Sequence, residues 1–283
     1  MDTNILIIGG SGGVGGALVR QLLDQGYRIR ASSRAPEAHV WPHGVEPVRA
    51  DLADPASIGS AAEGCESVFL YVQGSAVATV GQLRTAGVKR ITVISTIDAA
   101  NESPVAAYNR RRHLEWENAV AASGLSFTCL RPGAFVSNAL RFFLPHLATG
   151  NVVRLPFPDS QQAPIDTWDI ARVAVVALTT PRLAGQRPVL TGPHSLTQRE
   201  QVAALSHLLR RPIEVEMVSV EAARAWMRER IPERYVELLL GQWAEETHMP
   251  AMVTTEVERI TGRAASPYAE ALARTLAERG RPS

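Results

Sequence analysis

Short apolar runs alternate with helically patterned stretches along the first 130 residues. The runs are rich in β-branched side chains, which is typical of buried strands, and they occupy 3–8, 28–33, 46–50, 67–71, 90–95 and 126–130. Stretches with helical spacing lie between them, at 14–25, 55–63, 76–86 and 105–123. This alternation predicts an α/β doubly wound fold, in which helices cover both faces of a parallel sheet and ligands bind at the carboxyl ends of the strands.

A glycine-rich turn joins the first strand to the first helix of this pattern. It reads GGSGGVGG over 9–16, with Gly9, Gly12 and Gly15 three residues apart. This spacing supplies a tight turn at Gly9, room for a pyrophosphate at Gly12, and close packing of helix on strand at Gly15. The start of the helix adds free N–H groups and partial positive charge. We therefore predict that the turn binds a dinucleotide.

The pattern changes after Arg131-Pro132-Gly133. Prolines interrupt the helical stretches that follow, and only 187–190 and 213–218 are candidate strands. We expect a dinucleotide-binding Rossmann domain at 1–150, whose sheet is completed by 187–191, and a smaller, mostly helical region at 151–283. The second region should cap the strand ends and form the substrate cleft.

Composition narrows the class of protein. The chain has 283 residues, 46% of them hydrophobic, and a net charge of +1, so it can bury a sizeable core and has no electrostatic bias toward nucleic acid or membrane. No apolar run reaches the ~18 residues that span a bilayer, and no signal peptide is recognisable. We expect a cytoplasmic protein.

Few side chains are available for metal, thiol or lysine chemistry. Cys65 and Cys129 are expected to be buried, reduced thiols, and no cysteine or histidine cluster has metal-ligand spacing. Lys89 is the one lysine, and all other basic residues are arginine. This bias resembles that of proteins from high-GC bacteria.

The end of the second strand predicts which dinucleotide binds. NAD enzymes usually place an acidic residue there to hold the ribose 2′-hydroxyl, but this chain has Ser32, Ser33 and Arg34. An arginine with neighbouring hydroxyls suits a 2′-phosphate, which favours NADP(H); the alternative is that Arg34 is a solvated charge. Asp51 follows the third strand, where its carboxylate can meet the adenine amino group, whereas the nearby Asp54 is the better candidate for a helix N-cap.

Together these residues resemble the NmrA-like, or atypical short-chain dehydrogenase/reductase, family. The resemblance covers at least residues 3–210, and its motifs occur in the family's order: GGSGGVG from Gly9, RASSR from Arg30, Asp51-Leu52-Ala53-Asp54, Ala86-Gly87-Val88-Lys89-Arg90, Ser123-Gly124-Leu125, Leu130-Arg131-Pro132-Gly133-Ala134-Phe135 with Asn138, Asp169-Ile170-Ala171, and Leu190-Thr191-Gly192-Pro193. The resemblance implies a dinucleotide-binding fold. Members include quinone and phenylpropanoid reductases, and also regulators that bind the nucleotide without catalysis.

With the residues already named, the resemblance implies a set of cofactor contacts. Pro132 and Gly133 would lie at the nicotinamide end, with Ser95 and His113 near them. The remaining candidates are Gly9, Ser11, Gly12, Gly13, Val14, Gly15, Ser32, Ser33, Arg34, Asp51, Leu52, Gln73 and Gly74.

The chain departs from the catalytic pattern of the wider superfamily. There a tyrosine donates a proton and a lysine four residues later lowers its pKa. When Glu117 and Ser123-Gly124-Leu125 set the register, the tyrosine position falls on Asn109 and the lysine position on His113. Lys89 precedes the fifth strand, at the opposite end of the sheet from the cofactor. The usual dyad is therefore absent.

Other groups are candidates for the roles of the missing tyrosine and lysine. His113 either faces the nicotinamide ribose, where an imidazole can orient it or pass a proton, or is a half-buried structural residue. Tyr108 either reaches the cleft or packs at the start of the helix. Ser95 and Thr96 end the fifth strand, where a hydroxyl can stabilise developing negative charge on a substrate carbonyl or cap a loop. Arg110, Arg111 and Arg112 are interpreted as a solvated face.

Large apolar side chains are candidate walls of the substrate cleft. Ile231, Tyr235, Leu238 and Leu239 have helical spacing, however, and such a stripe is more often core than pocket. The candidates are Phe135, Phe142, Trp226, Tyr235, Trp243 and Met249.

We predict an NADP(H)-dependent oxidoreductase that passes hydride between the nicotinamide and a quinone, enone or carbonyl compound. The substrate is expected to be a small, apolar or aromatic molecule, and a homodimer is a possible assembly. Quinones and activated alkenes demand less proton donation than ketones, which fits the absent dyad. Two alternatives stay open: a non-catalytic NADP(H)-binding regulator or redox sensor, and a biosynthetic enzyme that isomerises or eliminates on the same scaffold.

Overall fold

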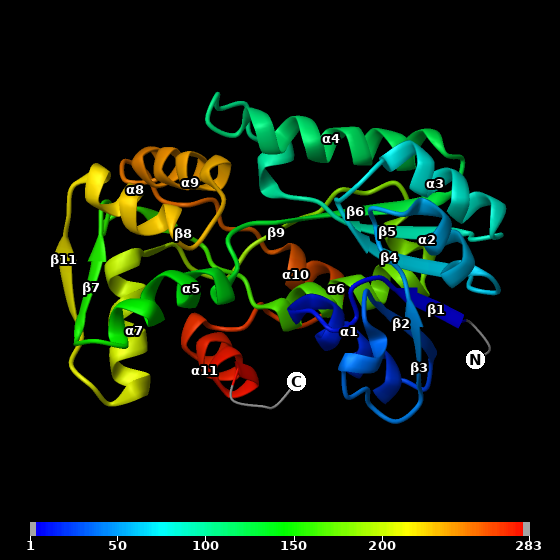
Figure 1. Cartoon of the computed structure of the whole chain (residues 1–283), viewed down its shortest axis with the longest axis horizontal. Coiled ribbons are helices and arrows are strands. Elements are labelled where there is room, and N and C mark those ends of the chain that lie inside the picture. The colour runs from blue at the N-terminus through cyan, green and yellow to red at the C-terminus, as the bar shows by residue number, and fades with distance from the viewer. Residues whose placement is uncertain (1–3, 280–283) are drawn as a thin grey trace.

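A seven-stranded parallel sheet forms the centre of the molecule in the computed structural model, which describes residues 4–279 (Figure 1). Thr3, the first residue of the first predicted strand, lies outside these residues. The strand order is β3-β2-β1-β4-β5-β6-β9, which confirms the doubly wound fold. The strands are β1 (Asn4–Ile7), β2 (Arg28–Ser33), β3 (Val45–Arg49), β4 (Ser67–Tyr71), β5 (Arg90–Ile94), β6 (Ser126–Pro132) and β9 (Val189–Leu190).

Successive side chains of β1 are buried on opposite faces of the sheet. Ile5 and Ile7 join one apolar cluster, and Leu6 and Ile8 join the other. Because side chains alternate along a strand, a continuous apolar run is required when helices cover both faces. This is why the unbroken run that precedes the glycine turn forms a central strand.

Helices cover both faces of the sheet. One layer contains α1 (Gly13–Asp24) and α6 (Thr167–Thr179), with α10 (Glu256–Thr261) against α6. The other layer contains α2 (Pro55–Ala62), α3 (Ala76–Thr85) and α4 (Ala107–Ala122), drawn above the sheet in Figure 1. Both layers leave the carboxyl ends of the central strands open.

A smaller region caps these strand ends and has a separate apolar core. It lies on the left of Figure 1 and contains two short strand pairs, the parallel β7–β11 and the antiparallel β8–β10. Its strands are β7 (Val152–Leu155), β8 (Gln161–Gln162), β10 (Leu196–Thr197) and β11 (Glu214–Met217). Its helices are α5 (Val136–Leu147), α7 (Gln198–Leu209), α8 (Val220–Arg228), α9 (Glu233–Glu245) and α11 (Tyr268–Arg279).

Relative to the boundary expected at residue 150, the chain passes between the two regions more than once, including the expected return of 187–191 to the sheet. Helix α5 starts before that residue yet contributes Phe142 and Phe143 to the core of the cap. Helix α6 lies after it yet packs against α1, and β9 pairs with β6 at the edge of the sheet. The cap is therefore built from several insertions into the sheet domain.

Two further expectations concern cysteines and membranes. Cys65 and Cys129 are buried free thiols, as predicted. None of the helices within residues 4–279 combines the length and the hydropathy that a membrane crossing requires.

Candidate active site

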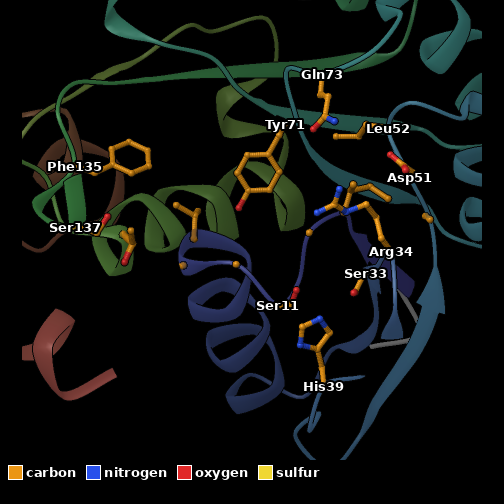
Figure 2. A pocket seen from close by; sticks show the side chains of 17 residues that line it. Ser11, Ser33, Arg34, His39, Asp51, Leu52, Tyr71, Gln73, Phe135 and Ser137 are labelled. Carbon is orange, nitrogen blue, oxygen red and sulfur yellow. The ribbon is translucent and has the colours of Figure 1, made fainter. Parts of the chain in front are cut away.

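A cavity of about 600 Å³ opens where β1, β2 and β4 end and α1 begins. Figure 2 shows Arg34, Ser33 and His39 toward one side of it, Phe135 and Ser137 toward the other, and Tyr71 between them. The lining residues that the sequence predicted are Gly9, Ser11, Gly12, Gly13, Val14, Ser33, Arg34, Asp51, Leu52 and Gln73. We refer to this space as the first cavity.

The glycine turn has the geometry that its spacing predicts. Gly9 has a φ of +73°, a conformation that side chains rarely adopt. A Cβ on Gly15 would lie 2.2 Å from the Gly9 carbonyl oxygen, so only glycine allows the helix to pack this closely. Gly13 and Val14 open α1, and their N–H groups have no acceptor within the helix. These N–H groups are available to an anion at the helix N-terminus.

Tyr71 lies beneath this turn and was not predicted from the sequence. Its hydroxyl accepts a hydrogen bond from the Gly15 N–H at 3.2 Å, and its ring would lie 2.9 Å from a Cβ on Gly9. Burial raises the pKa of Tyr71 to about 12, which keeps the phenol neutral. Its place at the end of β4, beside the strand that carries the glycine turn, is the signal that could have identified it.

The other side of the first cavity is polar. Arg34 makes no hydrogen bond or ion pair with any residue in 4–279, so its guanidinium is free to bind a ligand. Asp51 accepts a hydrogen bond from the Ala53 N–H at 2.9 Å, and Asp54 caps α2, the role predicted for Asp54. His39 lines the cavity beside Ser33 and Arg34 and was missed because it lies in a loop.

Several predicted cofactor residues support the first cavity without lining it. Ser32 is fully buried, and its Oγ accepts a hydrogen bond from the Gly9 N–H at 3.3 Å. Gly74 has a φ of +70°, and a Cβ there would lie 2.0 Å from the Leu52 carbonyl oxygen. Pro132 is buried at the end of β6. These residues shape the backbone that surrounds the ligand space.

A second cavity, of about 910 Å³, lies between the strand ends and the cap. Gly133 and Ala134 line it, and Phe135, the next residue, lines the first cavity. The stripe at Ile231, Tyr235, Leu238 and Leu239 lines one wall while its Ile231 and Leu239 pack against the cap core, and Phe142, Trp243 and Met249 also line the space. Trp226 instead stacks on His146, with 4.3 Å between ring centroids. The two cavities therefore adjoin at the segment after β6.

One side of the second cavity carries carboxylates and amides. Asp98, in the short helix Ile97–Ala100, accepts hydrogen bonds from the Asn109 amide at 2.9 Å and the Gln242 amide at 3.0 Å. Glu246, which follows α9, accepts one from the Gln162 amide at 3.1 Å. Sequence reasoning missed this group because the residues are far apart in the chain.

Ser95 belongs to a buried ion-pair network instead of either cavity. Its Oγ donates a hydrogen bond to Glu117 at 2.6 Å, and Arg131 and Arg187 also donate to Glu117. Burial opposes the charge of Glu117, but the hydrogen bonds and positive charges of these partners outweigh it and hold its pKa below the ordinary value. The Ser95 proton is therefore committed to Glu117. Of the two hydroxyls at the end of β5, Thr96 is the one that lines the second cavity.

The two candidates on α4 have different environments. Tyr108 is 41% exposed and lines neither cavity among the described residues. His113 is half-buried, and its Nδ1 has no hydrogen-bond partner in this part of the chain. Burial, together with the charge of Arg112, lowers the pKa of His113 to about 4. At neutral pH His113 is an uncharged imidazole that has no proton to spare as an acid.

Lys89 lies away from both cavities. It precedes β5, and its ammonium pairs with Glu66 at 2.6 Å on an exposed surface. Among residues 4–279 no group of three or more histidine, cysteine, aspartate or glutamate side chains has the geometry to hold a metal ion.

Curated relatives match nearly the whole chain. The chain is 35% identical over 271 residues to the (4-alkanoyl-5-oxo-2,5-dihydrofuran-3-yl)methyl phosphate reductase of Streptomyces griseus, covering 93% of this chain and 95% of that protein. It is 32% identical over 278 residues to the NAD(P)H azoreductase of Xenophilus azovorans, covering 94% and 96%.

Solved structures share the fold. The NADPH-dependent quinone oxidoreductase of Escherichia coli in complex with NADPH has a TM-score of 0.79 at 21% identity, covering 96% of this chain and 99% of that chain. The triphenylmethane reductase of Citrobacter sp. in complex with NADP(H) has a TM-score of 0.78 at 20% identity, with the same coverage.

A family model described as NAD(P)H-binding matches residues 9–181, which contain the glycine turn and most of the sheet. An NmrA-like oxidoreductase of Aspergillus flavus also matches, at 25% identity over 259 residues, 84% of this chain and 83% of that protein. The chain therefore belongs to the NAD(P)H-binding family and is an oxidoreductase of the NmrA-like, atypical short-chain dehydrogenase/reductase type.

Proposed function

We propose that the protein is an NADPH-dependent reductase of apolar, electron-poor compounds such as quinones and enones. The observation that carries the proposal is the meeting of the two cavities at Gly133, Ala134 and Phe135. A nicotinamide bound beside this segment would face a substrate in the second cavity. A hydride passes directly from one bound molecule to the other, so the two binding sites must adjoin.

The residues of the first cavity fit a dinucleotide with a 2′-phosphate. Glycine is required at positions 9 and 15, and the start of α1 offers unpaired N–H groups to the pyrophosphate. Arg34 has no partner among residues 4–279, and Ser33 and His39 line the cavity beside it. A free guanidinium next to hydroxyl and imidazole groups binds a phosphate better than a ribose hydroxyl. NADP(H) is therefore the proposed cofactor.

The second cavity supports the substrate class. Its volume suits a drug-sized molecule, and its apolar wall includes Phe142, Leu238, Leu239 and Trp243. The two curated relatives are named for reduction of an alkanoyl-substituted oxo-dihydrofuran that carries a methyl phosphate, and for azo reduction. Acceptors of both kinds contain a planar, electron-poor double bond. We propose an acceptor of this kind for the present chain.

When bound, the cofactor supplies a hydride; the protein supplies position and polarity. Gly133 and Ala134 offer backbone to both ligands, and the apolar wall excludes water from the reacting atoms. His113 lines neither cavity among the described residues and is an uncharged imidazole at neutral pH, so it is not proposed as the acid. Thr96 is placed to donate a hydrogen bond to a substrate carbonyl.

Arg34→Ala tests the cofactor assignment. The substitution removes the guanidinium from the 2′-phosphate, so NADPH binding should weaken by about 10- to 100-fold, whereas NADH binding should change little. Dissociation constants measured by nucleotide fluorescence would check this. Arg84→Ala is the matched control, because Arg84 is exposed on α3 and lines neither cavity. Equal losses for both nucleotides in Arg34→Ala would defeat the assignment.

Turnover tests the reaction. The purified protein with NADPH should reduce at least one of menadione, cyclohexenone, methyl red and crystal violet. The loss of NADPH absorbance would measure the rate. These compounds represent a quinone, an enone, an azo dye and a triphenylmethane cation. Tight NADPH binding with no turnover of any of them would instead favour a nucleotide-binding regulator.

A further inference from the structure

Glu246 is half-buried at the edge of the second cavity and has little around it to stabilise a negative charge. One Oε atom accepts the hydrogen bond from Gln162, the only side-chain partner that it has among the described residues. Burial, together with the negative charges of Asp98 and Glu245, raises its pKa to about 8. Glu246 is therefore a neutral carboxylic acid at the edge of the substrate space near pH 7.

The neighbouring carboxylate of Asp98 is better suited to carry the charge. Asp98 accepts hydrogen bonds from two amides, those of Asn109 and Gln242, whereas Glu246 accepts one. Burial also raises the pKa of Asp98, but these donors oppose the shift. When two nearby carboxyl groups compete, the proton stays on the one with fewer donors. Of the two carboxyl groups, Glu246 is therefore the one expected to hold a proton near pH 7.

Two buried glutamines line the same cavity, and their amide oxygens have no partner among the described residues. Gln201 is fully buried, and its Nε2 donates to the Leu196 carbonyl at 3.3 Å. Because a carbonyl can only accept, this contact fixes the amide orientation and leaves Oε1 without a partner among the described residues. Gln198, 2% exposed, also has an unpartnered Oε1.

We propose that Glu246 is the catalytic acid that protonates the reduced substrate, in place of the tyrosine that the chain lacks. The proposal rests on the proposed reductase function. With an enone, hydride forms a C–H bond at the β-carbon, and the electron pair of the double bond moves onto the carbonyl to give an enolate. The O–H bond of Glu246 then breaks, its proton joins the enolate, and the carboxylate left behind takes a proton from solvent. NADPH is the reductant.

Other proton donors are less suited to this role. Ser95 has committed its proton to Glu117, and His113 is uncharged at neutral pH. Tyr235 lines the second cavity, with the guanidinium of Arg234 4.8 Å from its ring centre. It is the principal rival to Glu246, so Tyr235→Phe must be compared with Glu246→Gln.

The first test needs neither cofactor nor substrate. A pH-difference infrared spectrum of the free protein should contain a carboxylic acid band that titrates near the pKa of about 8. The band should disappear in Glu246→Gln and persist in Glu115→Gln, a control at an exposed site on α4. A parent protein without such a band would overturn the proposal, as would a band that survives in Glu246→Gln.

The second test compares acceptors that differ in their need for a proton. Reduction of cyclohexenone consumes a proton, whereas hydride transfer to the crystal violet cation gives a neutral product without one. Glu246→Gln should lower the ratio of kcat for the enone to kcat for the dye about a hundredfold or more. In the parent protein, kcat for the enone should fall as the pH rises past the pKa of Glu246, because the acid loses its proton.

The outcomes separate this proposal from the proposed function. Loss of both activities in Glu246→Gln, with NADPH binding intact, would show that the residue shapes the cavity and would overturn its role as acid. Retention of both, or a selective loss of enone reduction in Tyr235→Phe instead, would also overturn it. If the parent protein reduces no acceptor, the proposed reductase function fails even where the infrared band is present.

Discussion

The two adjoining cavities are built in different ways. The first is formed at the ends of neighbouring strands, and the glycine turn at residues 9–14 provides the part that is proposed to bind phosphate. The second is formed by side chains from α5, α9, β8 and the loops after β5 and β9. A local motif specifies the first cavity, whereas only the folded cap assembles the second. The cofactor site can therefore be retained while the substrate site changes.

The side chains at the edges of the cavities reflect this difference. At the first, a guanidinium and hydroxyls are exposed to the ligand, and glycines prevent steric conflict with the backbone. At the second, an acid with a raised pKa and two unsatisfied glutamines lie beside an apolar wall. The first arrangement favours tight binding of a charged molecule. The second favours a less polar molecule that exchanges a proton.

The largest change in stability that leaves cofactor affinity unaltered is expected for substitution of Phe142. Its side chain is 9% exposed and packs edge-on against Trp243, with 5.3 Å between ring centroids, so it belongs to both the cap core and the cavity wall. Phe142→Ala should lower the free energy of unfolding by about 3 kcal/mol while leaving NADPH affinity unchanged. Urea denaturation and nucleotide fluorescence would measure the two quantities. The control Leu209→Ala, at an exposed site on α7, should lower the free energy of unfolding by about 0.5 kcal/mol or less.

A parallel loss of NADPH affinity in Phe142→Ala would break the comparison, because the two cavities would then depend on the same packing. An unchanged free energy of unfolding would show that Phe142 acts as cavity wall alone.

Gly15→Ala should act mainly on NADPH binding, with a smaller cost in stability than Phe142→Ala. The added Cβ would lie 2.2 Å from the Gly9 carbonyl oxygen, so the turn must shift, at a cost of about 1–3 kcal/mol in stability. NADPH binding should be lost even where the protein stays folded. Gly16→Ala is the control: its Cβ would lie 3.5 Å from the Gly10 carbonyl oxygen, an ordinary contact, and the helix should gain up to about 1 kcal/mol. Calorimetric titration with NADPH and thermal unfolding would separate the two variants.

The same difference explains what could be predicted from the sequence. The positions of the strands and the turn at Gly9 follow from local periodicity and spacing, because each element is fixed by its own apolar run or glycines. Tyr71 and Glu246 could not be assigned in the same way, since their roles arise from neighbours such as Gly15 and Gln162 that are distant in the chain. The stripe on α9 also shows that helical spacing does not distinguish a core from a cavity wall.

The smallest expected effect concerns His113, on the helix that passes near both cavities. Its folded-state pKa of about 4 lies below the unperturbed value of 6.5, so the unfolded state binds a proton in this range that the folded state does not. Acidification from about pH 7 to pH 5.5 should therefore cost about 1 kcal/mol of stability through this residue. His113→Gln should lose that part of the pH dependence, measured by urea denaturation across the range. A slope that persists unchanged in His113→Gln would mean that other buried groups cause it, and that the imidazole of His113 is free to take up a proton in the folded protein.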